Sequence, residues 1–284
     1  MNEEAARRPS STSQSDDRLV TERFPRSSQY HADWVLANAM GSNTLWLTEW
    51  LASAMDLTSG MRVLDLGCGR AISSIFLARE FGVQVWATDL WISASENIQR
   101  IRDADLLDRV FPIHSDARAL PFAGGFFDAI VCIDSFSYYG TDDLFLNYLA
   151  NFVKPQGQIA IAGAGLVQEL DSVPEHLREF WTQDFWCLHS AQWWRRHWER
   201  TGIVEIEVAD TMSAGWQVWL DWQSTAHPDN TTEIETIKAD RGEYLGYVRT
   251  VGRRADNAKL EDYCWPDTMR SFPAEYKTVP LLRK

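Results

Sequence analysis

Residues 63–71 carry the strongest chemical signal in the sequence, because a short apolar run there ends in two glycines. The letters V-L-D-L-G-C-G-R-A predict a strand, a tight turn and the start of a helix. Glycines let the backbone approach a ligand closely, and a helix N-terminus offers free N–H groups to an anion. Asp89 stands twenty residues beyond Gly69, at the end of the next predicted strand. A carboxylate there can accept both hydroxyls of a ribose, so the pattern predicts a nucleoside site.

Two classes of nucleoside site compete for this pattern. A dinucleotide site would have the sequence G-x-G-x-x-G/A, but its third position is Ile72, and Asp65 has no part in that fingerprint. The segment instead resembles the class I S-adenosylmethionine (SAM) methyltransferases, whose motif is roughly h-h-D-x-G-x-G, where h is an apolar residue.

Four further motifs of that family follow in chain order. They are residues 88–90 (T-D-L), residues 115–122 (S-D-A followed by L-P-F), residues 127–131 (F-D-A-I-V) and residues 153–157 (V-K-P-Q-G). Gln156 replaces a glycine that many relatives have, while Gly157 is retained. The resemblance covers residues 31–252 and is closest to the UbiE-like and cyclopropane-synthase-like small-molecule enzymes.

The resemblance implies SAM as the cofactor and a role for each motif. The backbone of Gly67, Cys68 and Gly69 would pass beside the methionine part of SAM. Asp65 would orient that turn and the cofactor's amino group, and Asp89 would hold the ribose.

The later motifs would complete the cofactor site. Leu90 and Trp91 would cover the adenine, although a core or interface position is an equal alternative for Trp91. The expected adenine-edge residues are Ser115, Asp116 and Ala117, with Asp116 accepting from the adenine amino group. Those expected in the methyl-transfer chamber are Ile133, Asp134 and Ser135, and a loop-capping role is the alternative for Asp134. Tyr30 and the break at Met40 and Gly41 are the expected lid.

Catalytic candidates follow the fourth predicted strand and the aromatic region beyond it. Tyr138 and Tyr139 occupy positions at which relatives have residues that touch the methyl donor or acceptor. Of the two, Tyr138 is the candidate catalytic residue. His189 precedes a predicted helix N-cap and is a candidate substrate contact or base. The six histidines show no metal-ligand spacing, so no metal is expected. No G-x-S-x-G sequence surrounds Ser135 or Ser137, which argues against a hydrolase.

Strands that alternate with helices predict an α/β fold with a doubly wound, mostly parallel seven-stranded sheet and one antiparallel strand near the C-terminus. The expected strands are residues 62–66, 83–88, 110–114, 127–133, 158–162, 204–209 and 244–251. The expected helices are residues 31–55, divided by Gly41, and residues 71–81, 92–103, 142–152, 175–181, 190–201 and 215–226.

Three parts of the chain are expected to differ in character. Residues 1–28 are rich in serine and charge and predict a flexible arm. Residues 29–252 form the methyltransferase domain, with lid helices at 29–56 and substrate-side segments at 164–243. Residues 253–284 contain three prolines and predict a C-terminal tail.

Composition and charge exclude several classes of function. The net charge is −13, and residues 29–252 alone carry −15, which would repel a nucleic acid backbone. No apolar stretch approaches the length of a membrane-spanning helix. The four cysteines form no CxxC pair and no signal peptide precedes them, which predicts a reduced, cytoplasmic protein. The sequence does not distinguish a monomer from a homodimer.

The chain has fourteen tryptophans, eight of them between residues 181 and 222. Several fit buried helix stripes, but Trp193 and Trp194 point in different directions on one helix, so at least one is expected to face a cavity or a partner. The sequence therefore predicts methyl transfer to O, N or C of a small aromatic or hydrophobic metabolite. The alternatives are cyclopropane-type methylene transfer to a lipid, an NAD-dependent oxidoreductase, and a non-catalytic SAM-binding protein.

Overall fold

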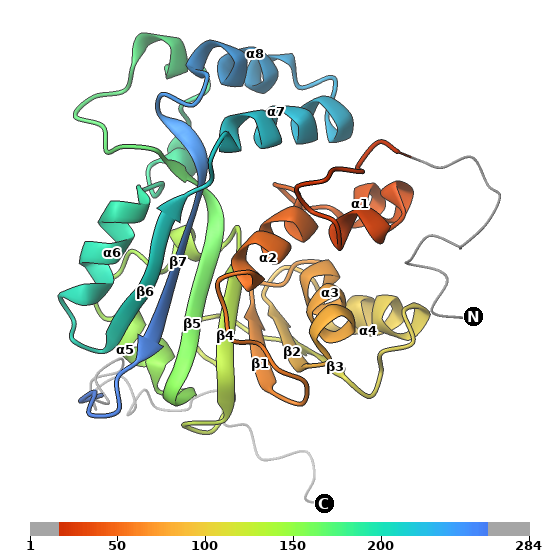
Figure 1. Cartoon of the computed structure of the whole chain (residues 1–284), viewed down its shortest axis with the longest axis vertical. Coiled ribbons are helices and arrows are strands. Elements are labelled where there is room, and N and C mark those ends of the chain that lie inside the picture. The colour runs from red at the N-terminus through yellow and green to blue at the C-terminus, as the bar shows by residue number, and fades with distance from the viewer. Residues whose placement is uncertain (1–16, 261–284) are drawn as a thin grey trace, which may run out of the picture.

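A seven-stranded sheet forms the centre of the protein in a computed structural model that describes residues 17–260 (Figure 1). Its strand order is β3-β2-β1-β4-β5-β7-β6. The strands are β1 (Arg62–Leu66), β2 (Gln84–Asp89), β3 (Val110–His114), β4 (Phe127–Ile133), β5 (Val153–Leu166), β6 (Val204–Thr211) and β7 (Leu245–Arg254). The pairs among β1 to β5 are parallel, whereas β7 runs antiparallel to both β5 and β6. The predicted doubly wound, mostly parallel sheet is confirmed.

Helices cover both faces of the sheet because alternate strand residues point to opposite sides. Val63 joins one buried cluster and its neighbour Leu64 joins the other. The first cluster includes residues of α1 (Ala32–Asn38), α2 (Thr44–Ala52), α3 (Ile72–Phe81), α4 (Ala94–Asp103), α7 (Gly215–Ala226) and α8 (Thr231–Asp240). The second includes residues of α5 (Phe145–Ala150) and α6 (Ala191–Glu199). Short 3₁₀ turns lie at Ser27–Gln29, Phe136–Tyr138, Glu175–Leu177 and Gln183–Phe185.

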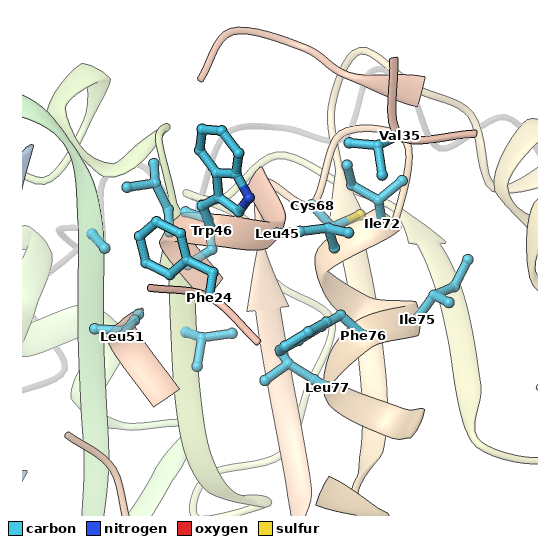
Figure 2. Packing of buried hydrophobic residues seen from close by; sticks show 14 of the residues in the cluster. Phe24, Val35, Leu45, Trp46, Leu51, Cys68, Ile72, Ile75, Phe76 and Leu77 are labelled. Atoms are coloured by element: carbon cyan, nitrogen blue, oxygen red, sulfur yellow. The ribbon is translucent and has the colours of Figure 1, made fainter. Parts of the chain in front are cut away.

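Part of the expected N-terminal arm belongs to the core. Leu19 and Phe24 are buried, and the Phe24 ring stacks on Trp46 of α2 with 5.6 Å between ring centroids (Figure 2). The Ser27 hydroxyl donates to the Leu45 carbonyl oxygen at 3.0 Å. The prediction of a flexible arm is therefore wrong for residues 17–28, because apolar side chains among the polar ones find places against α2. Residues 1–16 lie outside the described part of the chain.

The predicted start of the C-terminal tail at residue 253 is wrong, because residues 253 and 254 still belong to the sheet. β7 continues to Arg254, and Arg253 pairs in the sheet with Gln158 and Glu205. Its guanidinium also donates to Glu207, Asp56 and the Gln156 carbonyl oxygen. These bonds hold the strand end in the sheet. Residues 261–284, the rest of the expected tail, lie outside the described residues.

Two glycines extend β5 beyond its predicted end at residue 162. A Cβ on Gly163 would lie 3.0 Å from the Asp134 Cα atom, and one on Gly165 would lie 2.5 Å from Val248 Cγ2. These glycines permit close strand contacts where the sequence indicated a break. The predicted helix at residues 175–181 is only the Glu175–Leu177 turn, and α8 was not predicted.

Candidate functional site

A cavity of about 570 Å³ opens where β1, β2 and β4 end. This is the edge of a doubly wound sheet where ligands bind, at the point where the strand order reverses. Thirteen of the residues predicted for the cofactor, the methyl-transfer chamber or catalysis line it, namely Gly67, Cys68, Gly69, Asp89, Leu90, Trp91, Ser115, Asp116, Ala117, Ile133, Asp134, Ser135 and Tyr138. Residues that were not assigned a site role also line it, among them Asn38, Thr44, Arg70, Ser73 and Arg118.

The glycine turn is fastened to the end of β2. Gly67 and Gly69 have φ angles of +72° and +54°, the left-handed region that favours glycine. The N–H groups of Gly67 and Cys68 both donate to the Thr88 carbonyl oxygen at 2.9 Å. The Gly69 N–H donates to Asp89 Oδ2 at 2.8 Å. The two motifs that the sequence placed twenty residues apart therefore form one unit.

Asp89 has one acceptor position left for a ligand. Its Oδ1 accepts the N–H groups of Trp91 and Ile92, both at 2.8 Å, and its Oδ2 accepts that of Gly69. A carboxylate has about four lone-pair sites, so a single position remains, on Oδ2. The side chain can hold one ribose hydroxyl in this arrangement, where the sequence predicted two.

Asp65 lies beneath the turn and does not line the cavity. Its Oδ2 accepts the hydroxyls of Ser73 and Ser74, both at 2.6 Å, on the first turn of α3. Burial raises the pKa of Asp65 to about 6, against the opposing effect of those two hydroxyls. Its predicted contact with the amino group of a ligand is not made from this buried position, and it holds the start of α3 instead.

The adenine-edge candidates, Ser115, Asp116 and Ala117, directly follow β3 and line the cavity. Asp116 accepts from the Arg118 backbone N–H at 2.8 Å and from the Arg118 guanidinium at 3.0 and 2.7 Å. The guanidinium hydrogen bond lowers the pKa of Asp116. Leu90 and Trp91 are exposed at the rim, Trp91 to 75%. The rim offers an apolar surface to a flat ring.

The opposite end of the cavity is formed by the residues that follow β4. Asp134 has a φ angle of +57°, and its carboxylate accepts the N–H of Ala164 on Oδ1 and that of Ser42 on Oδ2, both at 3.0 Å. Burial raises the pKa of Asp134. Asp134 thus accepts from two distant segments of the chain and not from the loop that follows it, so the loop-capping alternative is wrong, and its side chain also lines the cavity.

Hydroxyl groups supply most of the other polar atoms at this end. The Ser135 and Tyr139 hydroxyls lie 3.1 Å apart, and each lies within 3.2 Å of the Cys132 Sγ. Tyr138 is 57% exposed, and partial burial raises the pKa of its hydroxyl. A phenol with a raised pKa is a poor base near neutral pH, so Tyr138 suits contact with a ligand better than proton abstraction.

Two predicted site residues lie away from the cavity. Tyr30 is buried, packs against Trp34 and Phe76, and donates from its hydroxyl to Glu80 at 3.0 Å. Its aromatic ring is core, so its expected place in a lid over the cofactor is wrong. Met40 and Gly41, the other lid candidates, do line the cavity.

His189 belongs to an aromatic stack beyond β5. Its ring stacks in parallel on the Trp193 ring, with 3.7 Å between ring centroids, and its Nδ1 lies 3.0 Å from Glu169 Oε2. Trp193 also stacks on His197, at 4.5 Å. His189 is absent from the cavity wall, because the stack and Glu169 hold its ring elsewhere. The structure therefore gives no support to His189 as a base for this cavity.

No cluster of His, Cys, Asp and Glu within residues 17–260 has the arrangement of a metal site. Within that same range, no helix has both the length and the apolar character needed to cross a membrane.

Comparison with known proteins places a methyltransferase domain at residues 63–157. The chain is 34% identical to the methyltransferase GfsG of Streptomyces halstedii, over 45% of this chain and 46% of that protein. It is 30% identical to the 27-O-demethylrifamycin SV methyltransferase of Amycolatopsis mediterranei (strain S699), over 53% of this chain and 57% of that protein. The chain thus spans about half the length of these curated relatives.

Solved structures share the fold at low identity. The geranyl diphosphate C-methyltransferase of Streptomyces coelicolor A3(2) has a TM-score of 0.61 at 19% identity, over 73% of this chain and 77% of that one. The [4+2]-cyclase SpnF has a TM-score of 0.60 at 19% identity, over 74% of this chain and 80% of that one. These likenesses establish the fold alone, and the second is to a cyclase.

Proposed function

We propose that this chain, which belongs to the class I S-adenosylmethionine-dependent methyltransferases, moves a methyl group from SAM to O, N or C of a small aromatic or hydrophobic metabolite. The observation that carries the proposal is the joined pair of motifs at the cavity floor, in which the Gly69 N–H donates to Asp89. This bond brings a glycine turn and a ribose-binding carboxylate to one wall.

The cavity has the parts that SAM requires. Ile72 and Ser73, on the first turn of α3, line the cavity, and a helix N-terminus favours a carboxylate such as that of the methionine moiety. The open acceptor position on Asp89 suits a ribose hydroxyl. Leu90 and Trp91 offer apolar surface to the adenine. The volume of about 570 Å³ falls within the roughly 300–1,000 Å³ of small-molecule sites.

Alignment and exclusion of water are the main tasks of this chain in the reaction. SAM would supply a methyl group on a sulfonium sulfur, which leaves with the electron pair of the broken C–S bond as the neutral thioether of S-adenosylhomocysteine. The chain has to hold the acceptor atom in line with that methyl group and keep water away from it. The residues after β4, including Asp134, Ser135 and Tyr138, form the wall where the acceptor would lie. A general base is needed only for an acceptor that must lose a proton to react.

The acceptor end favours an uncharged or cationic acceptor. Its wall is made of hydroxyl groups, aromatic rings and the Asp134 carboxylate. Arg70 and Arg118 are the cationic side chains among the described lining residues: Arg118 pairs with Asp116, and Arg70 directly follows the glycine turn and donates to the Ala37 carbonyl oxygen. A phosphate group beside Asp134 would meet a negative charge, and the described lining residues that follow β4 include no cation to balance it. We therefore expect the acceptor to lack a phosphate near the reacting atom.

A reducing compartment fits the thiols of this chain, and we assign the enzyme to the cytoplasm. Cys68, Cys132 and Cys187 are free, and the first two are buried. Small molecules are the partners that the cavity can hold.

Binding and transfer assays test the proposal separately. Calorimetry should show that the full chain binds S-adenosylhomocysteine and does not bind NAD. SAM with an isotopically labelled methyl group should then label a member of a panel of aromatic alcohols, phenols and amines. Failure to bind S-adenosylhomocysteine would overturn the assignment. Binding without label transfer to any acceptor, fatty acids included, would favour a non-catalytic role.

A further inference from the structure

The chain between α1 and α2 crosses the cavity and is held from two sides. We call residues Met40, Gly41 and Ser42 the strap. Met40 and Gly41 line the cavity. The Ser42 N–H donates to Asp134 Oδ2 at 3.0 Å, and the Gly41 carbonyl oxygen accepts from Trp222 Nε1 at 2.9 Å. The two holders come from distant parts of the chain, the end of β4 and the middle of α7.

Backbone geometry shows how closely the strap sits on its neighbours. Gly41 has a φ angle of +73°, and a Cβ on it would lie 2.8 Å from Asp134 Oδ2. Met40 Sδ would lie 3.2 Å from a Cβ on Gly69, so the strap also covers the glycine turn. The strap therefore contacts both ends of the cavity, the turn at one and Asp134 at the other.

Trp222 of α7 is buried and hydrogen-bonded to the strap. Its side chain is fully buried, and its ring packs edge-on against Trp46 of α2, with centroids 6.2 Å apart. A buried indole N–H needs an acceptor, and the Gly41 carbonyl oxygen provides it. α7, which carries Trp222, lies at the top of Figure 1, beyond the end of β5 and within the segment expected to face the acceptor.

We propose that Trp222 and Asp134 are positioning residues that together hold the strap over the cavity, so that α7 fixes the strap against the glycine turn. The sequence predicted a lid at this place, and the two bonds tie it to the body of the fold from both sides. The role of the strap in methyl transfer rests on the proposed function. Whether Trp222 and Asp134 restrain the strap can be measured even if that function is wrong.

Hydrogen exchange on paired variants of the full chain tests the hold. Trp222→Phe keeps an aromatic ring and removes the N–H donor. Trp219→Phe is the matched control, because Trp219 lies on the same helix, is also buried, and donates its indole N–H to Glu233 instead of the strap. Trp222→Phe should speed exchange of the Ser42 amide by roughly 2- to 12-fold, the factor that one hydrogen bond supports. Trp219→Phe should leave that amide unchanged.

A second variant keeps the test decisive if Trp222→Phe folds poorly. Gly41→Ala places a Cβ against Asp134 without touching α7, and Gly41 is exposed, so this variant should fold and should also speed exchange of the Ser42 amide. If Asp134 and Trp222 hold the same strap, their effects on the exchange rate of the Ser42 amide should not be independent. The fold-increase in that rate in the double variant Asp134→Asn/Trp222→Phe should then be smaller than the product of the fold-increases in the two single variants. Equal Ser42 exchange in Trp222→Phe and Trp219→Phe, or unchanged exchange in Gly41→Ala, overturns the proposal.

Affinity for S-adenosylhomocysteine then separates this proposal from the function. Trp222→Phe should weaken that affinity several-fold, because the strap covers the glycine turn, while Trp219→Phe should not. A wild-type chain that does not bind S-adenosylhomocysteine would contradict the proposed function, and the exchange rates alone would then decide whether the strap is held. A Trp222→Phe chain with faster Ser42 exchange and unchanged affinity would overturn the link between the strap and the cofactor.

Discussion

Gly67 faces Ser135 so closely that a Cβ on the glycine would lie 2.2 Å from the Ser135 Oγ. The contact joins the turn after β1 to the chain after β4. It leaves the Gly67 backbone against the hydroxyl cluster of Ser135 and Tyr139, and all three residues line the cavity. Any side chain at residue 67 must displace Ser135 or move the turn.

Gly67→Ala should therefore destabilise the fold more than a glycine replacement in open space. Gly60→Ala is the control, because Gly60 has a φ angle of +87° and no atom within 4 Å of its Cβ position. The control should lose about 1–2 kcal/mol of unfolding free energy from backbone strain. Gly67→Ala should lose a further ~1–3 kcal/mol from the clash. Urea unfolding measures both, and equal losses would contradict the close approach.

Replacement of Asp89 by Asn tests the single acceptor position. Loss of one charged hydrogen bond costs ~1.5–3 kcal/mol, so affinity for S-adenosylhomocysteine should fall by roughly 10- to 150-fold in calorimetry. Asp103→Asn makes the same charge change on the exposed surface of α4 and should leave the affinity unchanged. Equal affinities in the two variants would show that Asp89 does not hold the ribose.

Local patterns in the sequence were sufficient to predict most of the sheet and most of the cavity wall. The strands β3 and β4 have the predicted bounds, because short apolar runs between polar turns leave few alternatives. The glycine turn and Asp89 were recognisable because their chemistry depends on residue type and spacing. The cofactor side of the cavity is made largely of such segments.

Contacts between distant segments were not predictable in this way. Nothing near Gly41 in the sequence indicates that Trp222 donates to its carbonyl oxygen, 181 residues away. Tyr30 looked like a lid residue by position alone, and only the packing against Phe76 shows that it is core. The missed helix α8 did have a local signal, Asn230 followed three residues later by Glu233, which is an N-cap pattern.

The buried Asp65 should make stability depend on pH. Its pKa is about 6 in the folded chain and 3.8 in an exposed carboxyl, so the folded state holds the extra proton between these values. Stability should fall as pH rises from about 4 to 6, by up to ~3 kcal/mol at 1.36 kcal/mol per pKa unit. Asp65→Asn lacks this titration. The unfolding free energy of wild type should therefore fall relative to that of Asp65→Asn as the pH rises over that range. If the unfolding free energies of the two proteins change with pH in the same way, burial of the Asp65 carboxyl is contradicted.

Two tryptophans of the aromatic region, Trp186 and Trp193, should respond differently to truncation. Trp186 is 73% exposed, and its neighbour Cys187 lies beside Ser137, which directly precedes Tyr138 of the cavity wall. Trp186→Ala should leave the unfolding free energy within about 0.5 kcal/mol of wild type, as for other surface changes. It should raise the acceptor KM and spare affinity for S-adenosylhomocysteine, because it removes apolar surface only at the acceptor end.

Trp193→Ala should show the opposite pattern. Its ring is clamped between His189 at 3.7 Å and His197 at 4.5 Å, so truncation removes two stacked contacts. We expect a loss of about 1–3 kcal/mol of unfolding free energy and an unchanged acceptor KM at a temperature where the variant is folded. Urea unfolding and initial rates with labelled SAM give both quantities for each variant. A raised KM in Trp193→Ala with an unchanged one in Trp186→Ala would place the acceptor beyond β5, beside the histidine stack, and away from Tyr138.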